Sequence, residues 1–376
     1  MAEPLKDMYH EPFMREFAAK VHRVYPAFDE AAFVSATMDS TWEGLTLKER
    51  IRKIAVALGS YLPSRYGDAL HVLYAIDEVC VGFPYLFFPD FVEVHGQADE
   101  HWEQSMTALE RFTSKSSAEF AVRAFLLREP EKMMRRMEEW AEHPNEHVRR
   151  LASEGCRPRL PWGQSLPMFK RDPAPILPVL EKLKADPSLY VRKSVANNLN
   201  DIAKDHPQLV LETAKIWSGK HEYTDWIIRH GCRNLVRKAD PDALSLFGYS
   251  QLDETEGKLF VSASISAAPN VLHIGESCEL TYELVMREGD PLRIRIEYAV
   301  DFVKSNGQTS RKLFLLSDKT VNGGVRLRAN RMHRFADLST RRHYPGEHRI
   351  ALTVNGVEAA HTIVVVKESL STRRTY

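Results

Sequence analysis

The stretch HVRRLASEGCRPRLPW, residues 147–162, places a carboxylate (Glu154), a tryptophan (Trp162) and several arginines close together in the chain. Such groups suit a reaction whose transition state is a cation held against a polyanion. One example is cleavage of an N-glycosidic bond, in which the departing base leaves an oxocarbenium-like sugar. A preorganised carboxylate stabilises that cation and can orient the attacking water. A tryptophan face can pack on the sugar and attract the positive charge of an alkylated base.

Other common chemistries lack their motifs. The sequence contains no Walker loop, no Gly-x-Gly-x-x-Gly fingerprint, no His-Glu-x-x-His and no Gly-x-Ser-x-Gly, so nothing indicates nucleotide-driven, metal-driven or common nucleophilic chemistry. Four cysteines are far apart and fit no metal-ligand spacing, which predicts reduced, buried thiols; they are Cys80, Cys156, Cys232 and Cys278. We therefore expect no cofactor, no metal and no disulfide framework.

The composition predicts a folded, soluble protein. The chain has 376 residues, of which 44% are hydrophobic and 27% charged, and this is enough for two or more globular domains with real cores. No apolar run reaches about eighteen residues, and residues 1–30 lack the basic-then-apolar pattern of a secretory signal. We expect a cytoplasmic protein, in a cytosol of the bacterial type, with no membrane association.

The net charge of zero conceals an uneven distribution. Residues 1–100 carry 9 Lys and Arg against 16 Asp and Glu, a net charge of −7, whereas residues 143–240 carry 17 against 11, a net charge of +6. A local positive field of this kind steers anionic polymers. The cations could equally well solvate helix surfaces, and charge alone leaves both interpretations open.

Up to about residue 250 the pattern is helical and contains an internal repeat. Apolar residues recur near the 3.6 period in LTLKERIRKIAVALGSYLP and SAEFAVRAFLLREPEKMMRRMEEWAEHP. HPNEHVRRLASEG at residue 143 aligns with DPSLYVRKSVANN at residue 186, an offset of 43, and WIIRHGCRNLVRKADP at residue 226 is a looser third copy. A period near 40 built from helix pairs predicts a mainly α protein, a HEAT-like α-solenoid with a concave surface. This face is the candidate DNA-binding face once the charges of the repeats are considered.

Helical geometry sorts the residues of each repeat onto faces. Val148, Leu151, Ala152 and Gly155 should face inward. The polar columns of the three repeats are Arg150, Glu154 and Arg157; Lys193, Asn197, Asp201 and Lys204; and Arg229, Arg233 and Arg237. The columns are mainly cationic, and this favours an anionic ligand because a solvated face usually alternates its charges. The predicted DNA-binding side chains in and beside the columns are Arg149, Arg150, Arg159, Arg192, Lys193, Asn197, Arg229 and Arg233.

The composition changes near residue 256. The segments that follow are short, β-branched and separated by turn residues, and Leu292, Ile294, Ile296, Tyr298 and Val300 alternate strictly. The pattern predicts an all-β immunoglobulin-like sandwich of about seven strands and about 110 residues. The chain should therefore comprise a helical domain, residues 1–255, and a sandwich domain, residues 256–376. The arginine-rich segment RLRANRMHRFADLSTRR could contact a phosphate backbone or form a solvated loop.

Three motifs resemble those of a known family. The sequences AEFAVRAFL, RRLASEGCRPRLPWG and LYVRKSVANNLNDIAKDHP are similar to those of the DNA alkylation repair glycosylases built from HEAT-like repeats, specifically the AlkC branch. The resemblance covers most of residues 1–250, and branches with an appended immunoglobulin-like domain would cover the rest. It implies a monofunctional DNA glycosylase that excises cationic N3-alkylated bases, such as 3-methylcytosine and 3-methyladenine, without flipping them into a pocket of the usual kind.

The same resemblance implies roles for individual residues. Glu154 and Asp201 would be the catalytic carboxylates, and Trp162 would pack against the deoxyribose of the lesion. The residues implied to lie near the lesion or its gap are Arg157, Phe120 and Glu119. Because a cationic base is already a good leaving group, an ionised carboxylate would suffice and a general acid could be absent.

Each of the three main site residues also has a structural interpretation. Glu154 could pair with arginines three and four residues away along its helix. Trp162 follows Pro161 in a predicted loop after a broken helix, where a tryptophan often plugs a core. Asp201 could cap its helix or pair with a nearby lysine.

Two other classes of function stay open at this point. A non-catalytic HEAT-repeat scaffold would bind nucleic acid in a salt-sensitive manner without releasing bases, and a protein-interaction adaptor would bind acidic partners with no preference for DNA. For the glycosylase we expect a monomer that acts at the nucleoid on double-stranded DNA containing alkylated bases and needs no obligate protein partner.

Overall fold

The computed structural model describes residues 4–250, 259–338 and 341–369. The chain divides into two compact units, Met1–Gly231 and Cys232–Tyr376. The first unit is helical, and the second contains two short helices followed by β-strands. The domain boundary predicted after residue 255 lies outside the described residues. Among the helices in these ranges, none is long and apolar enough to cross a membrane.

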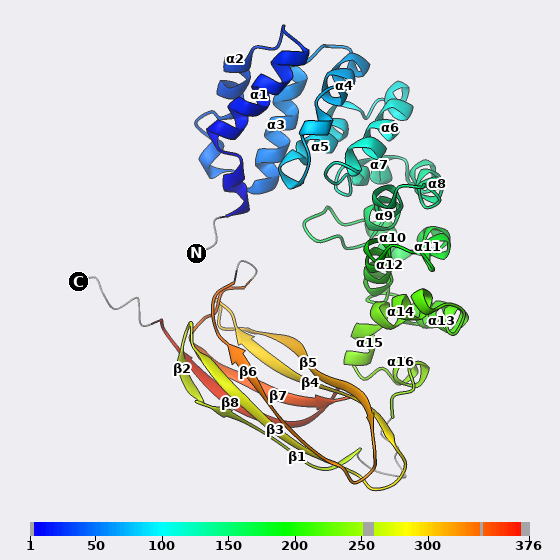
Figure 1. Ribbon diagram of the computed structural model, residues 1–376, viewed down its shortest axis with the longest axis vertical. Helices are drawn as coiled ribbons and strands as arrows, with labels where there is room; N and C mark the ends of the chain where they lie inside the picture. Colours follow the sequence, from blue (N-terminus) through cyan, green and yellow to red (C-terminus); the bar gives the residue numbers. More distant parts are fainter. Residues whose placement is uncertain (1–3, 251–258, 339–340, 370–376) are drawn as a thin grey trace, which may run out of the picture. The chain divides into compact units, whose positions relative to one another are not determined.

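The first unit is a succession of short and medium-length helices (Figure 1). They are α1 (Glu11–Val24), α2 (Glu30–Thr37), α3 (Leu47–Tyr61), α4 (Tyr66–Tyr74), α5 (Phe87–His95), α6 (Trp102–Thr113), α7 (Val122–Arg128), α8 (Pro130–Trp140), α9 (Glu146–Gly155), α10 (Pro167–Arg171), α11 (Leu177–Leu183), α12 (Leu189–Ile202), α13 (Pro207–Trp217) and α14 (Glu222–Gly231). Single 3₁₀ turns lie at Leu5–Met8, Trp42–Gly44, Asp77–Val79, Phe83–Tyr85, Asp99–His101 and Ala174–Ile176. Many helix starts follow local signals, with proline in the first turn of α1, α8, α10, α11 and α13.

The later helices of this unit form pairs, as the predicted repeat requires. Helix α8 packs on α9, α11 on α12 and α13 on α14, while α12 also packs on both α9 and α14. Figure 1 shows α8, α11 and α13 in one layer and α9, α12 and α14 in the other. Each pair buries its apolar stripe against its neighbours. The prediction of a HEAT-like α-solenoid is confirmed.

Two arginines at the 43-residue offset make the same contacts in successive repeats. The Nη1 of Arg149 donates to the carbonyl oxygens of His143 and Pro144, at 3.0 and 2.7 Å. Arg192 repeats this arrangement with the equivalent Asp-Pro pair, at 2.9 and 2.8 Å. Arg149 also donates from Nε to Asp186 Oδ2 at 2.6 Å and so joins one repeat to the next. Both guanidinium groups therefore close the turns that precede α9 and α12.

The inward face predicted for α9 is confirmed. Val148, Leu151 and Ala152 are at most 1% exposed. Gly155 is buried as well, and a Cβ atom at this position would lie 2.6 Å from Cγ2 of Val122. The absence of a side chain thus allows the end of α9 to approach α7 closely.

The third polar column was predicted on one continuous helix, and this is wrong. Helix α14 ends at Gly231, and a separate helix, α15 (Arg233–Arg237), begins after Cys232. Gly231 packs so closely on α12 that an added Cβ would lie 3.0 Å from Cβ of Leu199. Arg229 therefore lies in the first unit, whereas Arg233 and Arg237 lie in the second. The three arginines are spaced regularly by four residues in the sequence although the helix is interrupted between them.

The second unit is a two-sheet β-sandwich preceded by α15 and α16 (Pro241–Leu246). Its strands are β1 (Phe260–Ala268), β2 (Val271–His273), β3 (Ser277–Met286), β4 (Leu292–Val303), β5 (Thr309–Val321), β6 (Arg326–Arg334), β7 (Gly346–Val354) and β8 (Val357–Lys367). One sheet has the order β1-β3-β6 and the other β2-β8-β7-β4-β5, with β2 parallel to β8 and the other neighbours antiparallel. The sandwich architecture was predicted correctly, with eight strands in the described residues against about seven expected.

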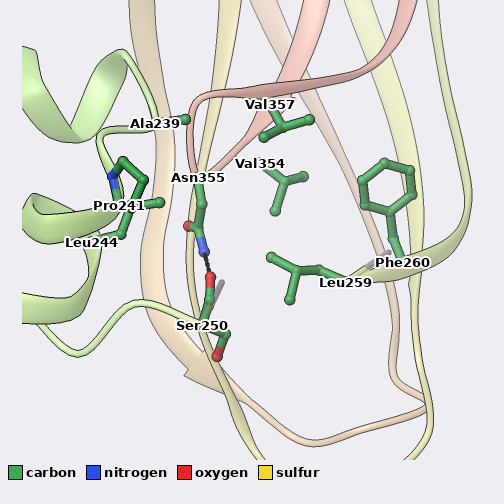
Figure 2. A pocket seen from close by; sticks show the side chains of 9 residues that line it. All are labelled: Ala239, Pro241, Leu244, Ser250, Leu259, Phe260, Val354, Asn355 and Val357. Carbon is green, nitrogen blue, oxygen red and sulfur yellow. Dashed lines mark hydrogen bonds between the residues drawn. The ribbon is translucent and has the colours of Figure 1, made fainter. Parts of the chain in front are cut away.

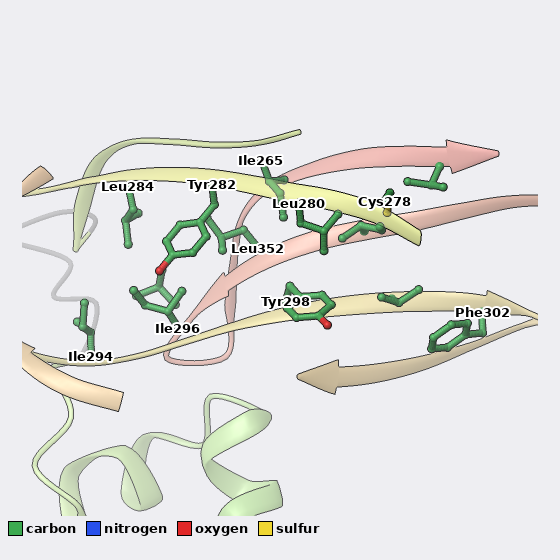
Figure 3. Packing of buried hydrophobic residues seen from close by; sticks show 14 of the residues in the cluster. Ile265, Cys278, Leu280, Tyr282, Leu284, Ile294, Ile296, Tyr298, Phe302 and Leu352 are labelled. Carbon is green, nitrogen blue, oxygen red and sulfur yellow. The ribbon is translucent and has the colours of Figure 1, made fainter. Parts of the chain in front are cut away.

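The core of the sandwich lies between the two sheets. Every second residue of β4 from Leu292 to Val300 is at most 3% exposed, as predicted for the inward face. The burial does not alternate strictly, because Glu297 and Ala299 between them are buried as well. Figure 3 shows the side chains of β3, including Leu280 and Leu284, pointing toward those of β4, including Ile296 and Phe302. Interdigitation of the two inner faces accounts for the stability of this unit.

The turn between β7 and β8 is joined by hydrogen bonds to Ser250, which precedes the sandwich, and to strand β4. Asn355 and Gly356 have φ angles of 48° and 82°, the left-handed conformation that a two-residue hairpin turn prefers. The Asn355 side-chain amide donates to the carbonyl oxygens of Ser250 and Arg293, at 2.7 and 3.3 Å, and its Oδ1 accepts from the Arg295 N–H at 2.7 Å. A mostly apolar pocket of about 180 Å³ lies beside this turn (Figure 2).

Candidate active site

Glu154 lies in the last turn of α9 and is held from several sides. Its side chain is 6% exposed within the folded unit. Oε1 accepts a hydrogen bond from Arg157 Nη1 at 2.6 Å, and Oε2 accepts one from Ser194 Oγ on α12 at 2.6 Å. Arg150 Nη2 lies 3.6 Å from Oε1. The contact with Ser194 means that packing of two repeats determines the orientation of this carboxylate.

Arg157 joins Glu154 to the second predicted catalytic carboxylate, Asp201. Its Nε and Nη2 lie 2.9 and 2.8 Å from Asp201 Oδ2, and Lys204 Nζ donates to Asp201 Oδ1 at 2.8 Å. Asp201 is 1% exposed and Arg157 is 7% exposed. Burial acts to lower the pKa of Arg157, but the two carboxylates outweigh it and raise the pKa above its ordinary value. The guanidinium therefore stays charged between them.

Trp162 is displayed on the loop between α9 and α10. Its side chain is 62% exposed, so the interpretation as a core plug is wrong, whereas the predicted loop position is confirmed. Its φ of 62° is rare for a residue other than glycine. The strained turn is closed by a hydrogen bond from Gly163 N to Leu160 O at 3.0 Å. Strain of this kind persists only where the surroundings enforce it, often at functional sites.

Arg123 on α7 holds the base of the same loop. It is 1% exposed, and its Nη1 donates to the carbonyl oxygens of Gly155 and Arg157, both at 2.9 Å. Its Nε donates to the carbonyl of Gln164. One buried side chain thus satisfies carbonyl groups on both sides of the segment that carries Trp162.

Glu154 and Trp162 line the same surface depression, which has a volume of about 390 Å³. Its walls are largely aromatic and aliphatic, and its charged lining comes from three side chains. The lining residues are Phe83, Leu86, Ser117, Glu119, Phe120, Arg150, Glu154, Leu160, Pro161, Trp162 and Tyr190. Of the residues that the family resemblance implies for the site, Glu119, Phe120, Glu154 and Trp162 line the depression. Arg157 and Asp201 do not, and they connect to it through Glu154.

Glu119 and Arg150 form the polar edge of the depression. Arg150 Nη1 donates to Glu119 Oε2, which also accepts from Ser117 Oγ at 2.7 Å. The guanidinium carbon of Arg150 lies 5.0 Å from the ring centroid of Tyr190. Burial acts to lower the pKa of Arg150, but Glu119 and Glu154 raise it above its ordinary value. Arg150 is therefore paired with the carboxylates of Glu119 and Glu154 in the free protein.

The other predicted DNA-binding residues differ in their surroundings. Arg159 donates from Nη2 to Asp205 Oδ1 at 2.7 Å, and Arg149 and Arg192 close turns as described above. Lys193 and Arg229 are exposed. Asn197 and Arg233 are half-buried. These contacts within the protein do not test DNA binding, so the DNA-binding roles stay predictions.

Several residues of the site were not found from the sequence. Ser194 occupies the position equivalent to the buried Leu151 of the preceding repeat, and a hydroxyl at an apolar position was the signal for it. Arg123 stands within the apolar run AEFAVRAFL. Lys48, which donates to the Trp162 carbonyl at 2.8 Å, comes from a distant part of the chain. In the part of the chain that the structure describes, no group of three or more His, Cys, Asp or Glu side chains could hold a metal ion.

Together the fold and the site define a HEAT-like-repeat protein with an appended sandwich, in which the buried carboxylate of Glu154 and the exposed ring of Trp162 line one open depression. The family model "DNA alkylation repair enzyme" matches residues 99–235, and the model of the YhaZ C-terminal Ig-like domain matches residues 261–368. The uncharacterized protein YhaZ of Bacillus subtilis is 45% identical over 352 residues, which cover 94% of this chain and 96% of YhaZ.

A solved structure is similar over the full length. Alkylpurine DNA glycosylase AlkC of Pseudomonas fluorescens, bound to DNA containing an abasic site analog, matches with a TM-score of 0.87 and 36% sequence identity, covering 97% of this chain and 100% of that one. The present chain belongs to the AlkC branch of the DNA alkylation repair enzymes. The predicted family and the immunoglobulin-like nature of the second unit are thereby confirmed.

Proposed function

We propose that this protein is a monofunctional DNA glycosylase that hydrolyses the N-glycosidic bond of cationic N3-alkylated bases, including 3-methylcytosine and 3-methyladenine. The observation that carries the proposal is the placement of Trp162. An exposed indole on a strained backbone adjoins the same depression as the buried carboxylate of Glu154. Support comes from the 36% identity with AlkC, which was solved with DNA containing an abasic site analog.

The proposed reaction begins with loss of the base. The bond between C1′ and the base nitrogen breaks, and its electron pair neutralises the positive charge of the alkylated ring. The sugar becomes an oxocarbenium-like cation, which Glu154 stabilises electrostatically while Trp162 packs against the deoxyribose. Water then adds to C1′ and releases a proton. No general acid is required because the leaving base is neutral once it departs.

The contacts of Glu154 suit this role. The hydrogen bonds from Ser194 and Arg157 fix the orientation of the carboxylate before substrate binds, and a preorganised negative group needs no reorganisation when the cation develops. Asp201 acts behind it, joined through Arg157, and either orients water or adds to the negative field.

Selectivity in this scheme depends on the charge of the lesion. The depression is an open surface feature with apolar walls, and we propose that the alkylated base is excised there without being flipped into an enclosed pocket. A neutral alkylated base is a poorer leaving group and would retain its bond. Neutral lesions should therefore be poor substrates.

The DNA itself would be held mainly through its phosphates. Exposed cations such as Lys193 and Arg229 are candidates for these contacts. We propose that the protein binds double-stranded DNA as a monomer, and that the sandwich adds contacts to the backbone. Removal of the sandwich at about residue 255 tests the second point, because full activity of the shortened chain would show that the unit is dispensable.

A non-catalytic nucleic-acid-binding scaffold is the second candidate. The observation in its favour is that Glu154 and Asp201 both bind Arg157, which is the arrangement expected of carboxylates that serve only to pair helices. This candidate predicts salt-sensitive binding to DNA and no release of bases.

The deciding experiment measures the bases released from methylated genomic DNA, resolved by mass. Wild-type protein should release 3-methylcytosine and 3-methyladenine, and Glu154→Gln should lose at least about a hundredfold in rate. Glu146→Gln is a matched control, since Glu146 lies exposed in the first turn of the same helix. A wild-type protein that binds DNA but releases no base would leave only the scaffold.

A further inference from the structure

Lys48 stands where helix energetics disfavour a cation. Helix α3 begins at Leu47, and Lys48 is the second residue of its first turn. The helix dipole is positive at this end, so a lysine there is unfavourable. The neighbouring Glu49 provides the usual solution, because its carboxylate accepts from the N–H and hydroxyl of Thr46. A residue that breaks a local rule calls for a compensating role elsewhere.

The compensating contacts lie at the depression. Lys48 Nζ donates to the carbonyl oxygen of Trp162 at 2.8 Å, across a separation of 114 residues. The same ammonium lies 4.7 Å from the ring centroid of Phe120, within the range of a cation–π interaction. One side chain of α3 therefore contacts two lining residues of the depression, Trp162 and Phe120, which the family resemblance had placed near the lesion.

The hydrogen bond acts on the strained part of the loop. Trp162 has a φ of 62° and is 62% exposed, so few contacts of its own side chain hold this conformation. Its carbonyl group is fixed by Lys48, and its neighbour Gly163 by the turn to Leu160. Without the ammonium, we expect the peptide after Trp162 to rotate and the indole to leave the depression that it shares with Glu154.

We propose that Lys48 is a positioning residue that locks Trp162, and with it the ring of Phe120, in the geometry needed for base excision. The inference rests on the proposed function. Lys48 acts through Trp162 rather than by touching the reacting atoms, and it links the acidic N-terminal helices to the cationic repeats that carry the carboxylates.

The test compares Lys48→Met, which keeps the length of the side chain but removes its charge and its donors, with Lys48→Arg, which keeps both. Lys53→Met is the matched control, because Lys53 lies on the same helix and pairs with Asp39 instead. Under single-turnover conditions, Lys48→Met should excise 3-methylcytosine about tenfold more slowly, with DNA affinity within about twofold of wild type. Lys48→Arg should recover most of the rate.

A double mutant of Lys48 and Trp162 distinguishes a positioning role of Lys48 from direct contact of Lys48 with DNA. If Lys48 acts through the indole, Lys48→Met should lower the rate by less than about twofold further in a Trp162→Ala background. A full tenfold effect in that background, or a fall in DNA affinity with a smaller salt slope, would mean that Lys48 binds phosphate and would overturn the proposal.

A measurement that does not depend on base excision tests the role of Lys48 separately from the proposed function. Trypsin can cut the loop after Arg159, and release of the carbonyl of Trp162 should speed that cleavage about fivefold in Lys48→Met but not in Lys53→Met, as mapped by mass spectrometry. An unchanged cleavage rate would refute the lock, whatever the activity. A wild-type protein that releases no base while Lys48→Met is cut faster would refute the glycosylase and the part of Lys48 in catalysis, leaving the lock as a structural contact.

Discussion

Replacement of Arg123 by methionine should destabilise the helical unit and loosen the loop that carries Trp162. The guanidinium donates to the carbonyls of Gly155, Arg157 and Gln164. Charged hydrogen bonds of this kind contribute about 2 kcal/mol each, or about 6 kcal/mol for three. Methionine fills a similar volume but leaves the three carbonyls without this donor.

Burial opposes part of that stabilisation. It lowers the pKa of Arg123 from its ordinary value to about 10, and a shift of this size corresponds to about 3 kcal/mol of unfavourable desolvation of the charged form. The net loss in the free energy of unfolding of Arg123→Met should therefore be about 3 kcal/mol. Arg123→Met should be destabilising because two of the three carbonyl groups, those of Gly155 and Arg157, belong to buried residues, where water cannot readily replace the donor.

The assay is urea denaturation followed by far-ultraviolet circular dichroism, which reports on the helical unit. Arg128→Met is the control, since Arg128 ends the same helix and makes an ion pair at 2.8 Å with Asp99, whose side chain is 85% exposed. That pair should contribute less than about 1 kcal/mol. If Arg123→Met also lost less than about 1 kcal/mol, the reasoning that one buried arginine holds this segment would be refuted.

Three further predictions concern other parts of the molecule. Burial, with nearby cationic groups, lowers the pKa of His333 from 6.5 to about 4, so the folded sandwich favours the neutral ring. The free energy of unfolding of the sandwich should be highest above about pH 6.5 and fall by up to about 3 kcal/mol toward pH 4. His333→Phe should flatten this dependence in urea titrations at several pH values. Lys193→Met should reduce the slope of log affinity for DNA against log salt by about one unit, whereas Arg192→Met, which removes a turn-closing guanidinium, should leave the slope unchanged. A slope unchanged in Lys193→Met would show that Lys193 lies on a solvated face. Leu284→Ala, at a position that is 0% exposed in the sandwich core, should cost about 2–5 kcal/mol in the unfolding transition of that unit, and a cost below about 1 kcal/mol would contradict the packing.

Local periodicity was enough to predict the architecture. The 43-residue offset, the apolar spacing of α9 and the strict alternation of β4 each depend on residues close together in the chain. Helix and strand geometry convert such spacing directly into faces. The same reasoning failed at the third repeat, where α14 ends at Gly231 and α15 begins at Arg233 although the polar spacing is regular. Gly231 packs closely on α12 at this point, a contact with a distant part of the chain that local spacing does not encode.

The candidate site was predicted in its residue types but only partly in its geometry. The pairing of Glu154 with Arg157 was one of the structural interpretations of the sequence, since the two residues are three apart, although α9 ends at Gly155 and Arg157 follows it. The exposure of Trp162 did not follow, since the same Pro-Trp sequence suits a buried plug or a displayed ring. The actual donors to the loop, Arg123 and Lys48, come from other helices.

By itself, then, the sequence determined the helices, the repeat, the sandwich strands and the family, all of which are encoded in neighbouring residues and short motifs. Only the tertiary structure decided which cations are already engaged, that Ser194 orients Glu154, and that Lys48 holds Trp162 from 114 residues away. The physical reason is that stacking of the repeats determines which distant side chains meet, and buried polar groups take their partners from whatever that stacking brings within reach.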